Sequence, residues 1–304
     1  MIEVLHPGAL ALVQDLGRPG LAHLGVPPSG ALDAAALRLA NRLVGNPEGA
    51  AAIEITLGGS RLRFARDAIV AITGADIAAT AGGRPLAMRA RERVDAGEEL
   101  RLGTTTAGTR TYLAVRGGLD AEAALGSRAT DQLTGLGPQP LRPGDRLTTG
   151  TALLPVPDAD FAPGLPPRAD PVLRVVLGPR SDWFVAEAIE RLLADVFTVT
   201  AASSRVGLRL AGPILRYARE GELLSEGIVT GALQVPPNGQ PILLLNDHPT
   251  TGGYPVIAVV VSEDLGVAGQ LAPGAAVRFR KVPPSPERRR AGRRGLAGPP
   301  RRRA

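Results

Sequence analysis

Short apolar segments, each bounded by Gly, Pro or Asp, recur along most of this 304-residue chain and restrict what it can fold into. Residues 242–245 and 256–261 are two clear cases, and the β-branched residues of the second favour a strand over a helix. Regularly spaced strands of this length, with 38 Gly and 28 Pro to form turns, are typical of β-barrels and sandwiches. We therefore expect a mainly β protein with a few helices, of which residues 29–45 and 181–193 are the clearest.

A Pro-rich segment without hydrophobic periodicity, residues 156–171, is predicted to be a linker between two domains. The N-terminal domain then covers residues 1–155 and the C-terminal domain residues 172–282. Residues 131–147 and 269–277 both place a Pro-Gly turn before a final strand, which indicates two similar β-barrels. The likeness covers only a few residues, so a chance similarity of turns is the alternative.

The net charge of +6 belongs to the end of the chain and not to its body. Residues 283–304 contain eight Arg and one Glu, and without them the chain is close to neutral. A segment rich in Pro, Arg and Gly and poor in apolar residues cannot bury a core, so we predict a disordered tail. Nucleic-acid binding by this tail is the less favoured interpretation.

Several classes of function are disfavoured by residues that the chain lacks. The absence of Cys excludes disulfides, thiolate chemistry and Cys-based zinc sites, and is compatible with the cytoplasm. No apolar run is long enough to span a membrane, and the residues after Met1 do not resemble a signal peptide. The three His, at positions 6, 23 and 248, do not have a metal-binding spacing, so no metal site is expected.

The polar insert between the two apolar runs named above is the first candidate site. Residues 246–254 place a carboxylate, an imidazole, hydroxyls and a phenol beside two glycines, whose backbone N–H groups can approach a ligand closely. The chemistry-bearing residues are Asp247, His248, Thr250, Thr251 and Tyr254, with Gly252 and Gly253. The alternative is a surface loop in which Asp and Thr only stabilise a turn.

Two further segments carry groups suited to anions. Residues 14–33 form a glycine- and proline-rich loop with Asp15, Arg18 and His23, and an Arg in such a loop can hold a carboxylate or phosphate. Arg205 and Arg209 would point to the same face if they lie in one strand. The simpler interpretations are a structural connection and two surface charges.

These residues fit binding of a small carboxylate-bearing amide with proton transfer by Asp or His, and they equally fit positioning of a phosphoryl group. Motifs for a serine hydrolase elbow, a zinc protease and a nucleotide-binding P-loop are absent. From the residues alone, the prediction stops at a small-molecule site of anionic character.

Several segments, in order along the chain, resemble the family called allophanate hydrolase subunit 2. They are QDLGRPGLAHLGVPPSGALD (14–33), ANRLVGN (40–46), GSRATDQL (126–133), SSRVGLRLAG (203–212), the long block at 223–265 and QLAPGAAVRF (270–279). The family includes the C subunit of 5-oxoprolinase, a protein that antagonises a sporulation-kinase inhibitor, and the carboxyltransferase region of urea amidolyase. The resemblance covers residues 1–282.

The resemblance implies two cyclophilin-like β-barrel domains with a cleft between them. It implies a hydrolase subunit, active only in a complex with partner subunits B and A, that opens 5-oxoproline to glutamate with ATP and Mg²⁺. One alternative is a carboxyltransferase component that moves a carboxyl group from carboxybiotin to urea or a similar amide, and only this alternative involves biotin. Another is a regulatory protein that binds a B-like kinase inhibitor.

The resemblance also suggests roles for the residues singled out above. Asp247 is expected to be a general base or the group that orients one, and Gln234 to bind the amide. The expected catalytic residues are Asp15, Asp247, Thr251 and Tyr254, and the expected substrate-binding residues are Arg18, His23, Arg205, Arg209, Gln234, Thr250, Gly252 and Gly253. The chain has Ala129 where the family usually has Ser, which removes one hydroxyl and could alter ligand choice.

Overall fold

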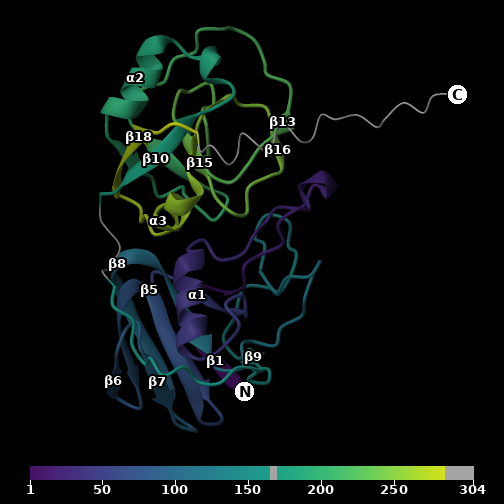
Figure 1. Cartoon of the computed structure of the whole chain (residues 1–304), viewed down its shortest axis with the longest axis vertical. Coiled ribbons are helices and arrows are strands. Elements are labelled where there is room, and N and C mark those ends of the chain that lie inside the picture. The colour runs from purple at the N-terminus through teal and green to yellow at the C-terminus, as the bar shows by residue number, and fades with distance from the viewer. Residues whose placement is uncertain (165–169, 285–304) are drawn as a thin grey trace, which may run out of the picture.

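The computed structural model describes residues 1–164 and 170–284, and these residues form two β bodies stacked along the long axis of the molecule (Figure 1). One sheet is built from strands within residues 2–147, and a closed barrel from strands within residues 172–281. The prediction of a mainly β protein with few helices is confirmed. The domain limits stay a prediction, and residues 165–169 of the predicted linker and 285–304 of the predicted tail lie outside the described residues.

The N-terminal sheet has nine strands and curls around its own apolar core. Its backbone path follows the order β2-β3-β8-β4-β1-β9, and the long strand β5 pairs with β8, β6 and β7. The elements are β1 (Ile2–Pro7), β2 (Leu10–Gln14), η1 (Ala22–Leu24), α1 (Ala34–Leu43), β3 (Ala52–Thr56), β4 (Ser60–Phe64), β5 (Ala68–Ala81), β6 (Arg84–Leu86), β7 (Arg91–Val94), β8 (Glu99–Val115) and β9 (Arg146–Leu147).

Two features of this sheet differ from the sequence prediction. Residues 68–73 and 77–80 are apolar runs separated by Gly74, Ala75 and Asp76, a pattern typical of two strands, but β5 is continuous through them, and its pairing with β8 shifts register between Gly74 and Asp76. Helix α1 was expected to begin after Ser29, yet Asp33 is its N-cap and accepts a hydrogen bond from the Ala36 N–H at 3.0 Å. Ser29 instead has a positive φ of 50° and donates its hydroxyl elsewhere.

The C-terminal body is a closed barrel with the strand order β10-β17-β14-β15-β12-β11-β18. The first and last strands, β10 and β18, pair in parallel and close it, whereas the other pairs in the barrel are antiparallel. The elements are β10 (Val172–Leu177), η2 (Ser181–Trp183), α2 (Ala186–Ala194), β11 (Phe197–Val199), β12 (Gly207–Ala211), β13 (Glu226–Gly227), β14 (Ala232–Gln234), β15 (Ile242–Leu244), β16 (Thr251–Gly252), β17 (Val256–Val260), η3 (Ser262–Asp264), α3 (Leu265–Gly269) and β18 (Ala276–Lys281).

The two bodies meet at α1, α3 and the polar loops between them (Figure 1). Leu32, which precedes α1, packs into the apolar core of the C-terminal barrel. Gln270 crosses the junction in the other direction, since its Oε1 accepts from the N–H groups of Thr109 and Arg110 at 3.0 and 2.9 Å. No helix in residues 1–164 and 170–284 is long and apolar enough to cross a membrane.

Candidate functional site

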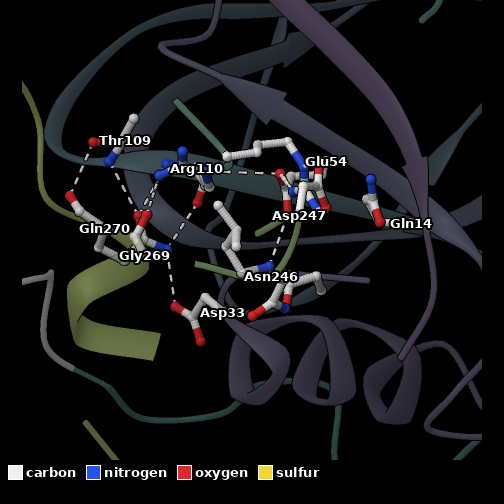
Figure 2. Close-up of polar contacts among 12 residues, drawn as sticks. Gln14, Asp33, Glu54, Thr109, Arg110, Asn246, Asp247, Gly269 and Gln270 are labelled. Carbon is white, nitrogen blue, oxygen red and sulfur yellow. Dashed lines mark hydrogen bonds and ion pairs between the residues drawn. The ribbon is translucent and has the colours of Figure 1, made fainter. Parts of the chain in front are cut away.

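A buried network of charges joins the two bodies, and Figure 2 shows part of it together with neighbouring polar contacts. Glu54, Arg110 and Tyr112 come from β3 and β8 of the N-terminal sheet, while Arg205 and Asp247 come from loops of the C-terminal body. Arg205 donates from Nε and Nη2 to the two Asp247 oxygens at 2.8 and 3.0 Å, and from Nη1 to Glu54. The Arg205 side chain is 1% exposed and both carboxylates are fully covered.

Glu54 stands inside an apolar run, which is compatible either with a solvent face or with a buried, paired carboxylate, and the second is found. The Tyr112 hydroxyl donates to it at 2.7 Å, the Leu32 N–H at 3.1 Å, and Arg110 Nε lies 3.7 Å away. Burial raises the pKa of Glu54, but the charges of Arg205 and Arg110 outweigh this effect and hold the pKa below its usual value. Glu54 is therefore an ionised carboxylate in the junction.

Asp247, the expected general base, has all its acceptor positions directed at protein groups. Besides Arg205, it accepts from the Ser29 hydroxyl at 3.0 Å and from the Gln132 N–H at 3.2 Å. This fully covered carboxylate therefore links Asp247 to Ser29, 218 residues away in the sequence, and to Gln132, 115 residues away. Its catalytic role stays a prediction.

The expectation that Arg205 and Arg209 share a strand face is wrong. Arg205 precedes strand β12 (Gly207–Ala211) and is buried, while Arg209 lies within that strand and is exposed. The chain turns between them, so the alternation of a strand does not apply to Arg205. Arg205 is also already paired with two carboxylates, and Arg209 does not reach it.

Asp15 and Arg18 hold the loop at residues 14–20 against the loop at residues 124–130. Asp15 accepts from the Gly17 N–H, the Ser127 hydroxyl and the Arg128 N–H at 2.7, 2.6 and 2.6 Å. Arg18 donates from Nη2 to the Ala129 carbonyl at 2.5 Å and from Nε to the Ala124 carbonyl at 3.3 Å. The third nitrogen of Arg18, Nη1, is buried and has no hydrogen-bond partner.

A cavity of about 360 Å³ lies between the two bodies, and it is lined by two of the expected substrate-binding residues, Arg18 and Thr250, and by His248 of the polar insert. Its N-terminal wall comes from the loop that carries Arg18, and its C-terminal wall from the segments around Thr230, His248 and Thr250. The lining residues are Arg18, Pro19, Gly20, Leu21, Ala22, Val26, Pro28, Ile228, Val229, Thr230, His248, Thr250, Val259, Val260, Ser262 and Leu265. This cleft is the candidate functional site.

His248 lines the cleft as a neutral imidazole and is hydrogen-bonded to the Thr230 hydroxyl, which lines the same cleft. Its Nδ1 lies 2.7 Å from the Pro249 carbonyl oxygen, which can only accept, so Nδ1 carries the proton. Nε2 then accepts from the Thr230 hydroxyl at 3.1 Å. Burial lowers the pKa of His248, which keeps the ring neutral near pH 7.

The remaining expected residues lie outside the cleft. Thr251 and Gly252 form β16, which pairs with β13, and Gln234 is buried with its Nε2 donating to the Tyr254 carbonyl at 3.2 Å. Gly253 and Tyr254 line a separate cavity of about 580 Å³ together with Trp183 and Tyr217. His23 is exposed, and its Nδ1 lies 3.1 Å from the Gly20 carbonyl oxygen.

The sequence interpretation missed Thr230, and it did not connect Ser29 or Glu54 with Asp247. Glu54 had a signal, because it stands inside an apolar run. Thr230 had none, since a Thr between Val229 and Gly231 resembles any turn residue. Among the described residues, no group of three or more His, Asp or Glu is arranged to hold a metal ion.

The sequence and the fold can both be compared with known proteins. The sequence model of the protein family called carboxyltransferase domain, subdomain A and B, matches residues 24–281. The chain belongs to this family.

Among its relatives, the C subunit of 5-oxoprolinase from Escherichia coli (strain K12) is 37% identical over 282 residues, which are 92% of this chain and 90% of that protein. The urea amidolyase of Lachancea kluyveri is 35% identical over 91% of this chain, which spans only 17% of that longer protein. In the crystal structure of the K. lactis urea amidolyase, the matching region has a TM-score of 0.86 and 34% identity, and covers 93% of this chain and 19% of that one.

Proposed function

We propose that this chain is the C subunit of an ATP-dependent 5-oxoprolinase that opens 5-oxoproline to glutamate. The observation that carries the proposal is the match to the 5-oxoprolinase C subunit along nine tenths of both chains. In this reaction the lactam C–N bond breaks, one water supplies the hydroxyl group to the carbonyl carbon and a proton to the released amine nitrogen, and a second water is consumed as ATP is converted to ADP and phosphate. The cleft between the two bodies is the proposed place for the small amide substrate.

The proposed enzyme is a heteromeric complex in the cytoplasm, in which this chain acts together with subunits B and A. ATP and its Mg²⁺ are proposed to bind through the assembled complex. The near-complete coverage of a relative called a subunit supports a chain that works with others.

The test is reconstitution of the chain with its cognate A and B subunits, with release of ADP and glutamate from 5-oxoproline as the readout. Omission of each subunit in turn is the control. We expect release only when all three are present. Release that is unchanged without this chain would contradict the proposal.

A second candidate function is carboxyl transfer from carboxybiotin to urea or a similar amide. The specific observation in its favour is the TM-score of 0.86 to the K. lactis urea amidolyase. Biotin belongs only to this alternative, and a biotin-bearing partner would have to supply it. Bicarbonate-dependent carboxylation of an amide by a reconstituted complex, with no glutamate release from 5-oxoproline, would favour this function over the first.

A further inference from the structure

Arg18 is a buried cation without a counter-charge in the wall of the cleft. The residue is 3% exposed, and no carboxylate among residues 1–164 and 170–284 lies within ion-pair distance of it. Its two hydrogen bonds go to neutral carbonyl oxygens, and Nη1 has no partner. Burying a charge is costly unless it is paired, so this guanidinium is suited to an anionic group that enters the cleft.

Arg205 and Arg209 differ from Arg18 in how their charges are compensated. Arg205 is equally buried, but Glu54 and Asp247 already neutralise it. Arg209 is exposed, so water solvates its charge at little cost. Of the three arginines that the sequence suggested for anion binding, Arg18 is therefore the one that is buried, lines a cavity and has no carboxylate partner.

On the opposite wall of the cleft, the Thr230 hydroxyl oxygen can serve a ligand only as a hydrogen-bond acceptor. The Thr230 hydroxyl donates a hydrogen bond to His248 Nε2, because the Nδ1–H of that ring is bonded to the Pro249 carbonyl. The lone pairs of the Thr230 oxygen then remain available as acceptors. Between the walls, Ile228, Val259 and Leu265 give the cavity an apolar lining.

We propose that this cleft binds a small molecule carrying both a carboxylate and an amide N–H, with Arg18 pairing with the carboxylate and the Thr230 oxygen accepting from the N–H. The apolar residues then contact the hydrocarbon part of the ligand. In taking 5-oxoproline as that ligand, the inference rests on the proposed function. Thr230 and Arg18 then determine specificity for 5-oxoproline. Asp247 is a buried structural residue that does not contact the ligand.

Calorimetric titration of the full-length chain, alone and bound to its B subunit, tests the inference with three probes. 5-Oxoproline has both groups, 2-pyrrolidinone lacks the carboxylate, and cyclopentanecarboxylate lacks the amide. Because a charge-assisted hydrogen bond and an amide hydrogen bond each contribute a substantial part of the affinity, we expect each simpler probe to bind at least tenfold more weakly. Equal affinities for 5-oxoproline and 2-pyrrolidinone would overturn the inference.

Two substitutions test the residues directly. Arg18→Met removes the guanidinium and Thr230→Val removes the hydroxyl at constant shape, and each is expected to weaken 5-oxoproline binding at least tenfold. Arg278→Met and Thr198→Val are the matched controls, since both residues are exposed on barrel strands away from the cleft and should bind 5-oxoproline like the unsubstituted chain. Thermal melting verifies the fold of each variant.

Arg18 also holds the loop at residues 124–130, so Arg18→Met could fold poorly. The probe series on the unsubstituted chain and the Thr230→Val titration then decide the matter. Wild-type affinity in both variants, or no binding of 5-oxoproline to either the chain or the complex at millimolar concentrations, would overturn the inference. ADP and glutamate release that does not depend on Arg18 or Thr230 would do the same and leave the proposed function standing, whereas binding without release would count against the proposed function alone.

Discussion

At the scale of single residues, Arg205 has the largest expected effect on stability. Replacing it with Met leaves the Glu54 and Asp247 carboxylates buried without their main counter-charge. Breaking a buried ion pair by removal of one partner costs about 3–5 kcal/mol, and we expect a loss of this size in urea unfolding of Arg205→Met. Arg209→Met, four residues away and exposed, should stay within about 0.5 kcal/mol of the parent. Similar losses in both variants would contradict this account of the network.

At the same scale, His248 is expected to make the stability of the folded protein depend on pH. Burial lowers its pKa in the folded protein below the unfolded value, so its contribution to stability is fully present above about pH 6.5. That contribution is lost as the pH falls through the folded pKa, because the unfolded chain then binds more protons. Between pH 7.5 and pH 5, the melting temperature of the parent should fall more than that of His248→Gln.

The control for this experiment is His23→Gln, at an exposed histidine of the same chain. It should keep the parent's dependence on pH. Glu54 titrates below the chosen window, because its folded pKa is lowered from an already acidic value. A fall that is equal in the parent and in His248→Gln would show that His248 titrates freely.

At the scale of structural elements, the loop between β2 and α1 requires a glycine at position 17. Gly17 has a φ of +80°, and a Cβ there would lie 2.4 Å from the Pro28 carbonyl oxygen. The left-handed backbone alone costs a non-glycine residue about 1–2 kcal/mol, and the backbone contact adds to it, so Gly17→Ala should lose more than this. Gly20→Ala is the matched control, because Gly20 has a φ of +91° and open space around it. Equal unfolding free energies for the two variants would show that the contact with Pro28 is unimportant.

Local sequence patterns predicted most of the strands and the two longer helices, and failed where the chain's conformation depends on distant contacts. The apolar run at residues 256–261 became β17, because β-branched alternation has a local cause. Ser29 resembled a helix N-cap, but its hydroxyl is taken by Asp247, 218 residues further on. Gly74 resembled a strand break, but it pairs with Thr111 inside β5, and only the register of the pairing with β8 shifts between Gly74 and Asp76.

The candidate site was also predictable only in part, because its residue types are local features and its charge pairing depends on distant contacts. Its residue types were visible in the loops at residues 14–33 and 246–254, and Arg18, His248 and Thr250 do line one cavity. Which arginine is already neutralised could not be read from sequence, since Arg205 lies 151 residues from Glu54 and 42 from Asp247. Spacing along the chain carries no information about such long-range pairs, whether the two partners belong to one body or to both.

At the scale of the whole molecule, the network should make the two bodies unfold as one unit. Glu54 is the carboxylate that the N-terminal sheet contributes to Arg205 of the C-terminal body. We expect one calorimetric transition for the parent and two resolved transitions for Glu54→Gln, in which the charge link across the junction is lost. Glu187→Gln, which removes an exposed ion pair within α2, is the control and should keep a single transition. A single transition in Glu54→Gln would show that apolar contacts and Gln270 couple the bodies without the charge link.

The parallel pairing of β10 with β18 also fixes the order in which the molecule can be completed during its synthesis. The N-terminal sheet has all its strands once Leu147 has been made, whereas the barrel cannot close until its last strand ends at Lys281. At translation rates of about 5–20 residues per second, the ribosome needs roughly 7–27 s to cover that interval. During this time Glu54 has Arg110 beside it but no closed barrel that positions Arg205, so a nascent chain carries an incompletely neutralised carboxylate on the face that later receives the barrel.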